Sequence, residues 1–186
     1  MGSSASAVRL LSELPTFEEE HLTVVVETPR GSRSKYNYDE RYGAFRLGGV
    51  LPAGMSFPHD FGLIPSTVGE DGDPLDVLLL LDAPVVVGCI VAARLIGVIE
   101  AEQREDDGKW VRNDRLLAVA TRSRSHAEIR RLDDLRPQLV EEIEAFFAQY
   151  NRLNGKEFKP TGHGDGDKAR RLVEAAQARF AERGSA

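Results

Sequence analysis

The hydrophobic pattern divides the chain into a β-rich part followed by a helical part. Up to about residue 121, short runs rich in β-branched and other apolar residues alternate with glycine, proline and charged residues, a pattern that predicts strands and turns. The expected strands lie at 23–28, 35–38, 44–47, 77–81, 85–98 and 115–121. Many short strands with glycine-rich corners predict a small, closed or partly closed antiparallel barrel.

Two later segments carry apolar residues at spacings of three and four, which is typical of amphipathic helices. We expect one helix between Asp133 and Gly155, with Pro137 in its first turn and Gly155 at its C-terminal exit. A second helix is expected from Asp167 to about Ala181. The apolar stripe of the first helix consists of Leu139, Ile143, Phe146, Phe147, Tyr150 and Leu153. The predicted fold class is α+β, mainly β, with two or more helices packed outside the barrel.

The length and composition indicate one folded domain. The 186 residues are 41% hydrophobic and 29% charged, which is enough for a core and ordinary for a globular chain. We therefore expect a single domain over 1–186. It consists of an N-terminal extension at about 1–20, a barrel core at 21–123 and a helical part at 124–186.

Charge and cysteine content limit the partners. The net charge of −6 argues against nucleic-acid binding, which normally needs a basic surface. The most apolar region, 77–99, is interrupted by Asp82 and Arg94, so we expect no membrane span. The N-terminus has no basic head before an apolar run, and Cys89 is the single cysteine, so the expected compartment is the cytoplasm.

The segment 70–76, Glu-Asp-Gly-Asp-Pro-Leu-Asp, carries the clearest chemical signal. Four of its seven residues are acidic, and Gly72 and Pro74 disfavour a helix, so it is expected to form a tight loop. Crowded carboxylates are costly unless cations compensate them, and hard oxygen ligands at short spacing suit Mg²⁺. The alternative is that these acids only solvate a turn, since Asp, Gly and Pro are common turn residues.

The order Asp-Gly-Asp-Pro-Leu-Asp-Val-Leu-Leu-Leu at 71–80 resembles the signature of the family I soluble inorganic pyrophosphatases. Further segments follow in family order: Val-Val-Val-Glu-Thr-Pro at 24–29, Lys35-Tyr36, Phe57-Pro58 with Gly62, Ile96-Gly97-Val98, and Phe146-Phe147 with Tyr150. The resemblance implies an OB-like β-barrel with helices outside. It also implies hydrolysis of pyrophosphate to two phosphates with several Mg²⁺ ions, or with Mn²⁺ or another divalent cation, in a homo-oligomer that is commonly a hexamer in bacteria.

The resemblance also implies a role for individual residues. Asp71 and Asp76 would be metal ligands, with Asp76 bridging two ions, and Glu27 would hold a further metal through water. Asp73 would bind metal and hold or deprotonate the attacking water. The residues expected to act on the phosphate oxygens are Lys35, Tyr150 and Arg115.

Several positions depart from the family pattern. An acidic position, an arginine and a tyrosine are replaced by Asn37, Gly49 and Phe61. Later in the chain, two aspartates, a lysine and a second lysine are replaced by Gln103, Asn113, Arg115 and Asn151. Because carboxylates and cations are lost together, we expect a site rebuilt for fewer metals. The neighbouring groups that could compensate are the acids Glu102, Glu105 and Asp114 and the cations Arg46, Arg112 and Lys156.

Three functional hypotheses follow. The first is Mg²⁺-dependent hydrolysis of pyrophosphate. The second is hydrolysis of a different phosphoanhydride or phosphate ester, because the losses at Gly49 and Asn151 remove expected grips on one phosphate. The third is a catalytically silent phosphate- or nucleotide-binding protein, against which the presence of Asp73 argues, since a binding protein has little use for a water-activating base.

Overall fold

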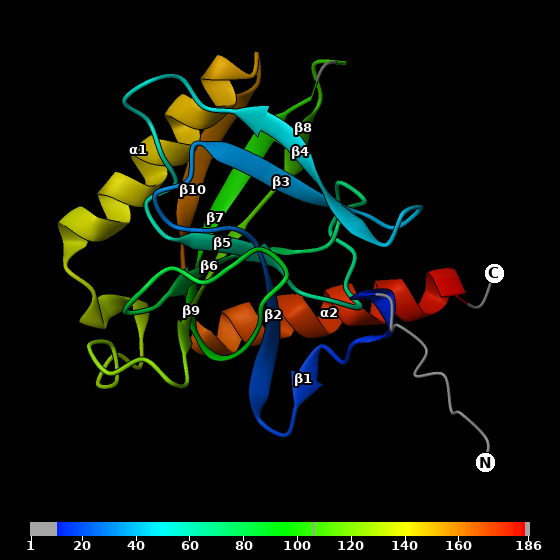
Figure 1. Ribbon diagram of the computed structural model, residues 1–186, viewed down its shortest axis with the longest axis vertical. Helices are drawn as coiled ribbons and strands as arrows, with labels where there is room; N and C mark the ends of the chain where they lie inside the picture. The colour runs from blue at the N-terminus through cyan, green and yellow to red at the C-terminus, as the bar shows by residue number, and fades with distance from the viewer. Residues whose placement is uncertain (1–10, 106, 185–186) are drawn as a thin grey trace.

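Five strands close into a ring in the computed structural model, which describes residues 11–105 and 107–184 (Figure 1). The ring strands, in order of pairing, are β2 (His21–Thr28), β5 (Asp60–Leu63), β6 (Asp76–Leu80), β9 (Arg115–Ala120) and β7 (Ile90–Arg104). A direct β2–β7 pairing completes the ring. The ring is antiparallel, as expected, except that β6 and β9 run parallel.

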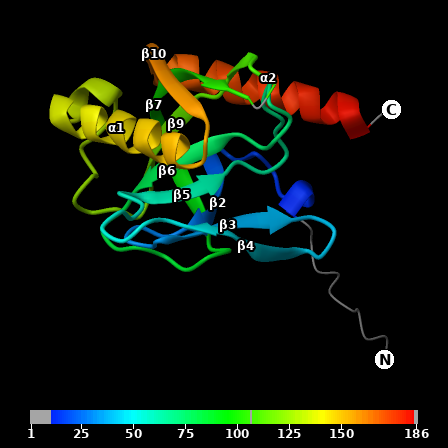
Figure 2. The same cartoon turned by 90° about the horizontal axis from the view of Figure 1, so that it is seen from above.

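Further strands extend this ring. β1 (Phe17–Glu18) pairs with β2, while β8 (Trp110–Arg112) and β10 (Glu157–Asp165) pair with β7. The hairpin of β3 (Ser34–Asp39) and β4 (Ala44–Val50) forms a separate small sheet, which lies on the side away from the helices (Figure 2). The N-terminal extension expected at about 1–20 therefore includes β1, while residues 1–10 lie outside the described part of the chain.

The strand prediction missed or displaced several elements. β5, β8 and β10 were not predicted, because glycine and proline interrupt the apolar pattern of β10 and the other two strands are short. The strand expected at 85–98 begins only at Ile90 and continues to Arg104. The chain turns first, with Gly88 at a φ of +85°, a conformation that side-chain-bearing residues rarely adopt.

The two predicted helices are α1 (Pro137–Leu153) and α2 (Gly166–Gly184). α1 starts at Pro137 rather than at Asp133, because a separate 3₁₀ turn, η2 (Leu132–Asp134), is followed by extended backbone at Leu135. Another 3₁₀ turn, η1 (Leu11–Glu13), precedes β1. Leu153, which was expected on the apolar stripe, is 47% exposed because α1 ends there. No helix in the described residues is long and apolar enough to cross a membrane.

β6 lies between two apolar clusters, each of which includes residues of one helix. Successive side chains of a strand point to opposite faces. Leu78 and Leu80 join the apolar cluster that also contains buried residues of α1, whereas Val77 and Leu79 join the cluster that contains buried residues of α2. The uninterrupted apolar run is therefore buried on both faces, as predicted. The acidic segment lies just before this buried strand.

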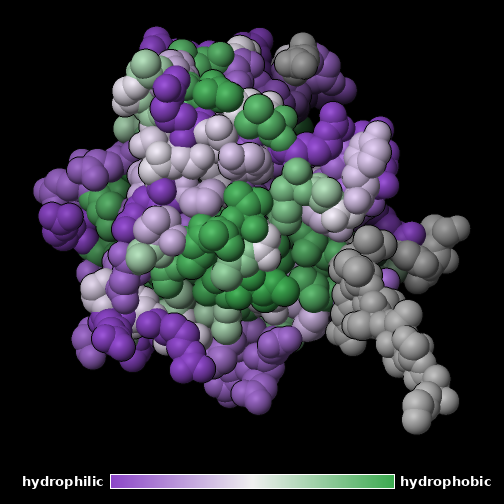
Figure 3. Space-filling model, in the orientation of Figure 1, coloured by the Kyte–Doolittle hydropathy of each residue, from purple (hydrophilic) through white to green (hydrophobic). Residues whose placement is uncertain are grey.

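Apolar side chains also reach the surface. Hydrophobic residues gather near the centre of the face seen in Figure 1, with polar residues around them (Figure 3). Large apolar side chains that are more than half exposed include those of Leu47, Val50, Val86 and Ile90. Exposed apolar clusters of this kind commonly mark contact surfaces.

Candidate active site

The segment 69–76, here called the carboxylate loop, is a tight turn just before β6. The N–H of Gly69 donates to the carbonyl oxygen of Asp73 at 2.7 Å, and the N–H of Asp73 donates to Asp71 Oδ1 at 3.2 Å. Gly72 has a φ of +95°, which glycine adopts without strain. The predicted loop thus holds Asp71, Asp73 and Asp76 on a backbone that local hydrogen bonds define.

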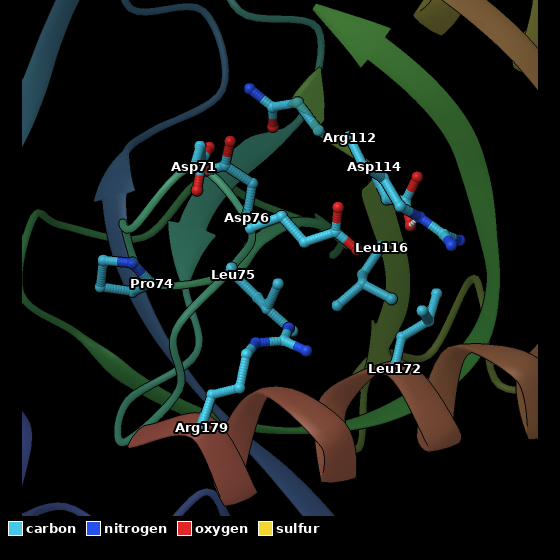
Figure 4. A pocket seen from close by; sticks show the side chains of 12 residues that line it. Asp71, Pro74, Leu75, Asp76, Arg112, Asp114, Leu116, Leu172 and Arg179 are labelled. Carbon is cyan, nitrogen blue, oxygen red and sulfur yellow. Dashed lines mark hydrogen bonds and ion pairs between the residues drawn. The ribbon is translucent and has the colours of Figure 1, made fainter. Parts of the chain in front are cut away.

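Helix α2, near the C-terminal end of the sequence, holds this loop through hydrogen bonds. The N–H of Val68 donates to the carbonyl oxygen of Ala176 at 3.1 Å, and Arg179 Nε donates to the carbonyl oxygen of Val68 at 2.8 Å. Arg183 Nη1 donates to the carbonyl oxygen of Gly72 at 3.2 Å. A cavity of about 60 Å³ lies between the loop, the start of β9 and α2, with Arg179 rising from the helix (Figure 4). Sequence reasoning missed these arginines, since nothing local connects them with the loop.

Glu27 contributes a carboxylate from the end of β2. It is 6% exposed, and its Oε1 accepts the N–H of Tyr38 at 2.9 Å. Burial raises the pKa of Glu27 to about 7, although the positive charge of Lys35 opposes this shift. The negative charges of Asp76 and Asp73 raise it further. Glu27 therefore lies within electrostatic range of the carboxylate loop.

Asp71 is exposed at the surface, unlike Glu27. Partial desolvation of its carboxyl group raises its pKa, the N–H of Asp73 lowers it, and the negative charges of Asp76 and Asp73 raise it. We call Glu27, Asp71, Asp73 and Asp76 the carboxylate arm of the site. Their hard oxygen donors and mutual repulsion fit a divalent cation. As they stand, no three Asp, Glu, His or Cys residues of the described chain are arranged closely enough to hold one.

Lys35 of β3 brings positive charge to this arm. Its Nζ donates to Asn37 Oδ1 and lies 5.5 Å from the centroid of the Phe61 ring, a cation–π geometry. Gly49 pairs with Lys35 across the hairpin, and a Cβ at Gly49 would meet nothing within 4 Å. The position expected to carry an arginine is therefore open space beside Lys35.

Tyr150 reaches the site from α1. Its ring centroid lies 5.8 Å from that of Phe57 and 6.1 Å from that of Phe146, so much of the side chain belongs to the core. Burial raises the pKa of Tyr150, and the negative charge of Asp76 adds to the shift. The phenol is thus close enough to the carboxylate arm for the charge of Asp76 to affect its pKa. The next residue, Asn151, is 3% exposed and donates through Nδ2 to the carbonyl oxygen of Phe147 at 2.9 Å, within the helix.

Arg115, at the start of β9, binds the carboxylate arm directly. Its Nη1 lies 2.7 Å from Asp76 Oδ2, and only 5% of its side chain is exposed. The same nitrogen donates to Asn113 Oδ1 and, at 3.1 Å, to the carbonyl oxygen of Asp114. The guanidinium also lies over two aromatic rings, 4.8 Å from the centroid of Phe147 and 5.3 Å from that of Phe158.

Two substituted positions continue from Arg115 as a chain of hydrogen bonds. Asn113 Nδ2 donates to Gln103 Oε1 at 3.2 Å, and Gln103 Nε2 donates to Glu105 Oε1 at 2.7 Å. Lys156 Nζ donates to Glu105 Oε2 at 2.8 Å. We call Gln103, Asn113 and Arg115 the amide arm of the site, and hydrogen bonds join their three side chains in a chain.

The groups expected to compensate for missing ligands and cations already have partners or face solvent. Asp114 accepts the N–H of Ala101 at 3.1 Å and Arg112 Nε at 2.7 Å, and Glu102 is exposed on β7. Arg46 pairs with Asp39. Glu105 and Lys156 pair with each other, so these side chains build the surroundings of the site rather than a second carboxylate cluster.

The fold and the site together define a mainly β protein with a carboxylate cluster suited to cations and a lysine and an arginine suited to an anion. Comparison with known proteins agrees with this class. The sequence profile described as "Inorganic pyrophosphatase" matches residues 24–181. Curated relatives named "Inorganic pyrophosphatase" include one from Thermus thermophilus, 36% identical over 176 residues, covering 91% of this chain and 97% of the relative. Another, from Nostoc sp., is 35% identical over 153 residues, covering 82% and 88%.

A solved structure of inorganic pyrophosphatase from Thermus thermophilus superposes with a TM-score of 0.85 at 35% identity, covering 92% of this chain and 99% of that one. The Helicobacter pylori inorganic pyrophosphatase gives a TM-score of 0.82 at 30% identity, covering 90% and 98%. The chain belongs to the inorganic pyrophosphatase family, and the fold that its signature implied is confirmed.

Proposed function

We propose that this protein is an inorganic diphosphatase, which hydrolyses pyrophosphate to two phosphates. The observation that carries the proposal is the carboxylate arm. Glu27, from β2, lies in electrostatic contact with Asp73 and Asp76 of the carboxylate loop and with Lys35. Acids and a cation that come from separate strands and share one site match the needs of phosphoryl transfer to water.

The carboxylate arm has the donors for Mg²⁺ or Mn²⁺. Glu27, Asp71, Asp73 and Asp76 would hold the ion, and when bound it supplies charge neutralisation and a more acidic water. Asp73 accepts the proton of the attacking water. Lys35 and Tyr150 hold the phosphate oxygens, and the charge of Arg115 beside Asp76 adds to the attraction of the anionic substrate.

Phosphate release from pyrophosphate in the presence of Mg²⁺ tests this proposal. Asp73→Asn keeps the shape of the side chain but removes the base, so we expect at least about a hundredfold lower turnover. Asp133→Asn, an exposed position of the η2 turn, is the matched control and should retain wild-type turnover. Equal inactivity of the wild type and Asp73→Asn would exclude hydrolysis of pyrophosphate. Stabilisation by phosphate compounds without turnover would then support a binding protein.

The open space beside Lys35 favours one alternative, a larger phosphoanhydride or a phosphate ester as substrate. A Cβ at Gly49 meets nothing within 4 Å, so a group attached to the second phosphate would find room there. A panel of diphosphates, triphosphates and monoesters, each with Mg²⁺ and Mn²⁺, tests this alternative. Turnover of pyrophosphate alone would exclude it.

We also propose that the protein is a cytoplasmic homo-oligomer, a hexamer by analogy with the family, without nucleic-acid or membrane partners. Exposed apolar side chains such as Leu47, Val50, Val86 and Ile90 support self-association. The net charge of −6 supports the absence of a nucleic-acid partner. Gel filtration with light scattering measures the assembly, and a monomer at micromolar concentration would contradict it.

A further inference from the structure

A second cavity lies where the β1–β2 hairpin, β7 and the start of α2 meet. It has a volume of about 380 Å³ and, among the described residues, shares no lining residue with the cavity beside the carboxylate loop. This volume is typical of pockets that bind small molecules. Four arginines line the cavity, which are Arg94 of β7, Arg130 and Arg131 just before η2, and Arg170 of α2. Guanidinium groups gathered in this way favour an anionic ligand.

Two of these arginines, Arg94 and Arg130, share one neutral acceptor. Arg94 Nη2 donates to the carbonyl oxygen of Ile129 at 2.6 Å, and Arg130 Nη1 donates to the same oxygen at 3.5 Å. Arg130 Nη1 also donates to the carbonyl oxygen of Ala127. Neither guanidinium forms an ion pair with a carboxylate of residues 11–105 or 107–184. Two positive charges therefore lie close together with neutral backbone oxygens as their partners.

The charge of Arg94 is poorly compensated by the protein itself. Its side chain is half-buried, and its Nε is buried without a hydrogen-bond partner in the described part of the chain. Burial lowers the pKa of Arg94, and the positive charge of Arg130 lowers it further. A positive charge in such surroundings is unfavourable unless an opposite charge approaches it. An anion in the cavity would supply that charge to both arginines.

The other two arginines of the cavity already have carboxylate partners. Arg131 Nη2 lies 3.9 Å from Asp134 Oδ1, and Arg170 Nε lies 3.0 Å from Glu174 Oε1. The guanidinium of Arg170 also lies 4.6 Å from the centroid of the Phe17 ring, a cation–π geometry. These two arginines therefore belong to the wall of the cavity, and the first pair carries the charge that is left for a ligand.

Three acidic residues, Glu20, Asp165 and Asp167, also line the cavity. Asp165 Oδ1 accepts the N–H of Lys168 at 2.8 Å and so caps the start of α2. Glu20 and Asp167 are exposed, and their carboxylates can accept hydrogen bonds from hydroxyl or amino groups of a ligand. Because their negative charge repels an anion, the charged group of a ligand is expected beside the first pair of arginines.

We propose that this cavity binds a phosphoryl group, whose oxygens accept hydrogen bonds from Arg94 and Arg130. The planar guanidinium matches two oxygens of a phosphate in both geometry and charge. Inorganic phosphate and an organic phosphate monoester offer the same group. The organic part of a monoester would lie against the apolar lining residues Leu22 and Leu95. The inference goes beyond the proposed function and does not depend on hydrolysis of pyrophosphate.

Calorimetric titration of the full chain with inorganic phosphate and, separately, with adenosine 5′-monophosphate tests the proposal. A chelating buffer without divalent ions excludes metal-dependent binding at the carboxylate arm. Arg130→Gln removes an exposed charge, and should weaken binding of whichever compound the wild type binds at least about tenfold, because charged hydrogen bonds are lost. Arg122→Gln, an exposed arginine outside the cavity lining, is the matched control and should bind like the wild type. Lys35→Gln should do the same, since Lys35 belongs to the other site.

The two compounds distinguish the sources of the phosphoryl group. Tighter binding of adenosine 5′-monophosphate would support a monoester as the ligand, and equal or tighter binding of inorganic phosphate would support the free anion. Arg130→Glu reverses the charge and should abolish binding of either compound. Absence of binding by the wild type, or binding that Arg130→Gln and Arg130→Glu leave unchanged, would overturn the proposal. Binding that is lost only in Lys35→Gln would also overturn it, because the anion would then lie beside the carboxylate loop.

Discussion

The two arms of the site differ in how their polar groups are satisfied. In the carboxylate arm, desolvation and like charge raise the pKa of both Glu27 and Asp71, so ionisation of these groups is unfavourable without a cation. In the amide arm, direct hydrogen bonds join the side chains of Gln103, Asn113 and Arg115, and only Arg115 Nε among the described buried polar atoms of this arm has no partner. The contact between the arms is the ion pair of Asp76 and Arg115.

This difference shows that a site can lose ligands without becoming disordered. A buried polar group without a partner is costly, so a substituted position must find another partner. The amides find theirs in one another and in Glu105, whereas the carboxylate arm keeps electrostatic strain that a bound cation would relieve. Under the proposed function, the carboxylate arm carries the chemistry, whereas the amide arm contributes structure and one buried positive charge.

The largest expected effect is a difference in pyrophosphate turnover between a variant of the carboxylate arm and a variant of the amide arm. Asp71→Asn should lower pyrophosphate turnover about a thousandfold, because a metal ligand contributes several kcal/mol of transition-state stabilisation. Gln103→Ala, in the amide arm, should lower it less than about tenfold, because Gln103 bonds to other protein groups. Steady-state rates at saturating Mg²⁺ measure both. Equal losses would mean that the arms share the chemistry.

The next effect concerns stability and pH. The pKa of Glu27 is about 7 in the folded protein against an ordinary 4.5, so the folded state holds a proton that the unfolded state releases between these values. Stability without metal should therefore fall as pH rises from about 4.5 to 7, by about 3 kcal/mol. Glu27→Gln should remove this loss and be more stable than the wild type at pH of about 8.

Urea unfolding in a chelating buffer at several pH values measures this difference. Glu141→Gln, an exposed position of α1, is the matched control and should keep the wild-type pH profile. A wild-type stability that is constant over the same pH range would contradict the raised pKa of Glu27.

A smaller gain is expected at the hairpin. Gly49→Arg places a cation in open space next to Lys35, and a charge-assisted bond to a phosphate oxygen should lower the KM for pyrophosphate about tenfold. Ala44→Arg is the control, since Ala44 is an exposed residue that pairs with Asp39 at the other end of the hairpin. An equal effect of both variants would indicate general attraction of the anion.

The smallest effect concerns the fastening of the carboxylate loop by α2. Arg179→Gln removes a charged donor to the carbonyl oxygen of Val68, so the loop should be less well ordered and Mn²⁺ affinity should fall about threefold. Arg171→Gln, an exposed position of the same helix, should leave the affinity unchanged. A lower Tm with unchanged Mn²⁺ affinity would show that Arg179 stabilises the helix and not the site.

Much of the fold followed from local patterns. The apolar run at 77–81 and the stripe of α1 are strong periodic signals, and both elements form within a few residues of their predicted bounds. β10 was missed because its glycines and proline weaken strand propensity, while its pairing with β7 supplies the stabilisation. Hydrogen bonds also explain why α1 starts at Pro137 and not at Asp133. The side chain of Asp134 accepts the N–H groups of Arg130 and Arg131, and Asp134 therefore belongs to the separate turn η2.

The sequence by itself determined the carboxylate loop, because glycine, proline and closely spaced aspartates act on their own backbone within a few residues. The resemblance of its residue order to the family signature then indicated the fold and the chemistry. Only the tertiary structure decided the partners of Gln103, Asn113 and Arg115 and the fastening of the loop by Arg179. Such contacts join segments far apart in the chain, so they depend on strand register and helix packing, which no local spacing encodes.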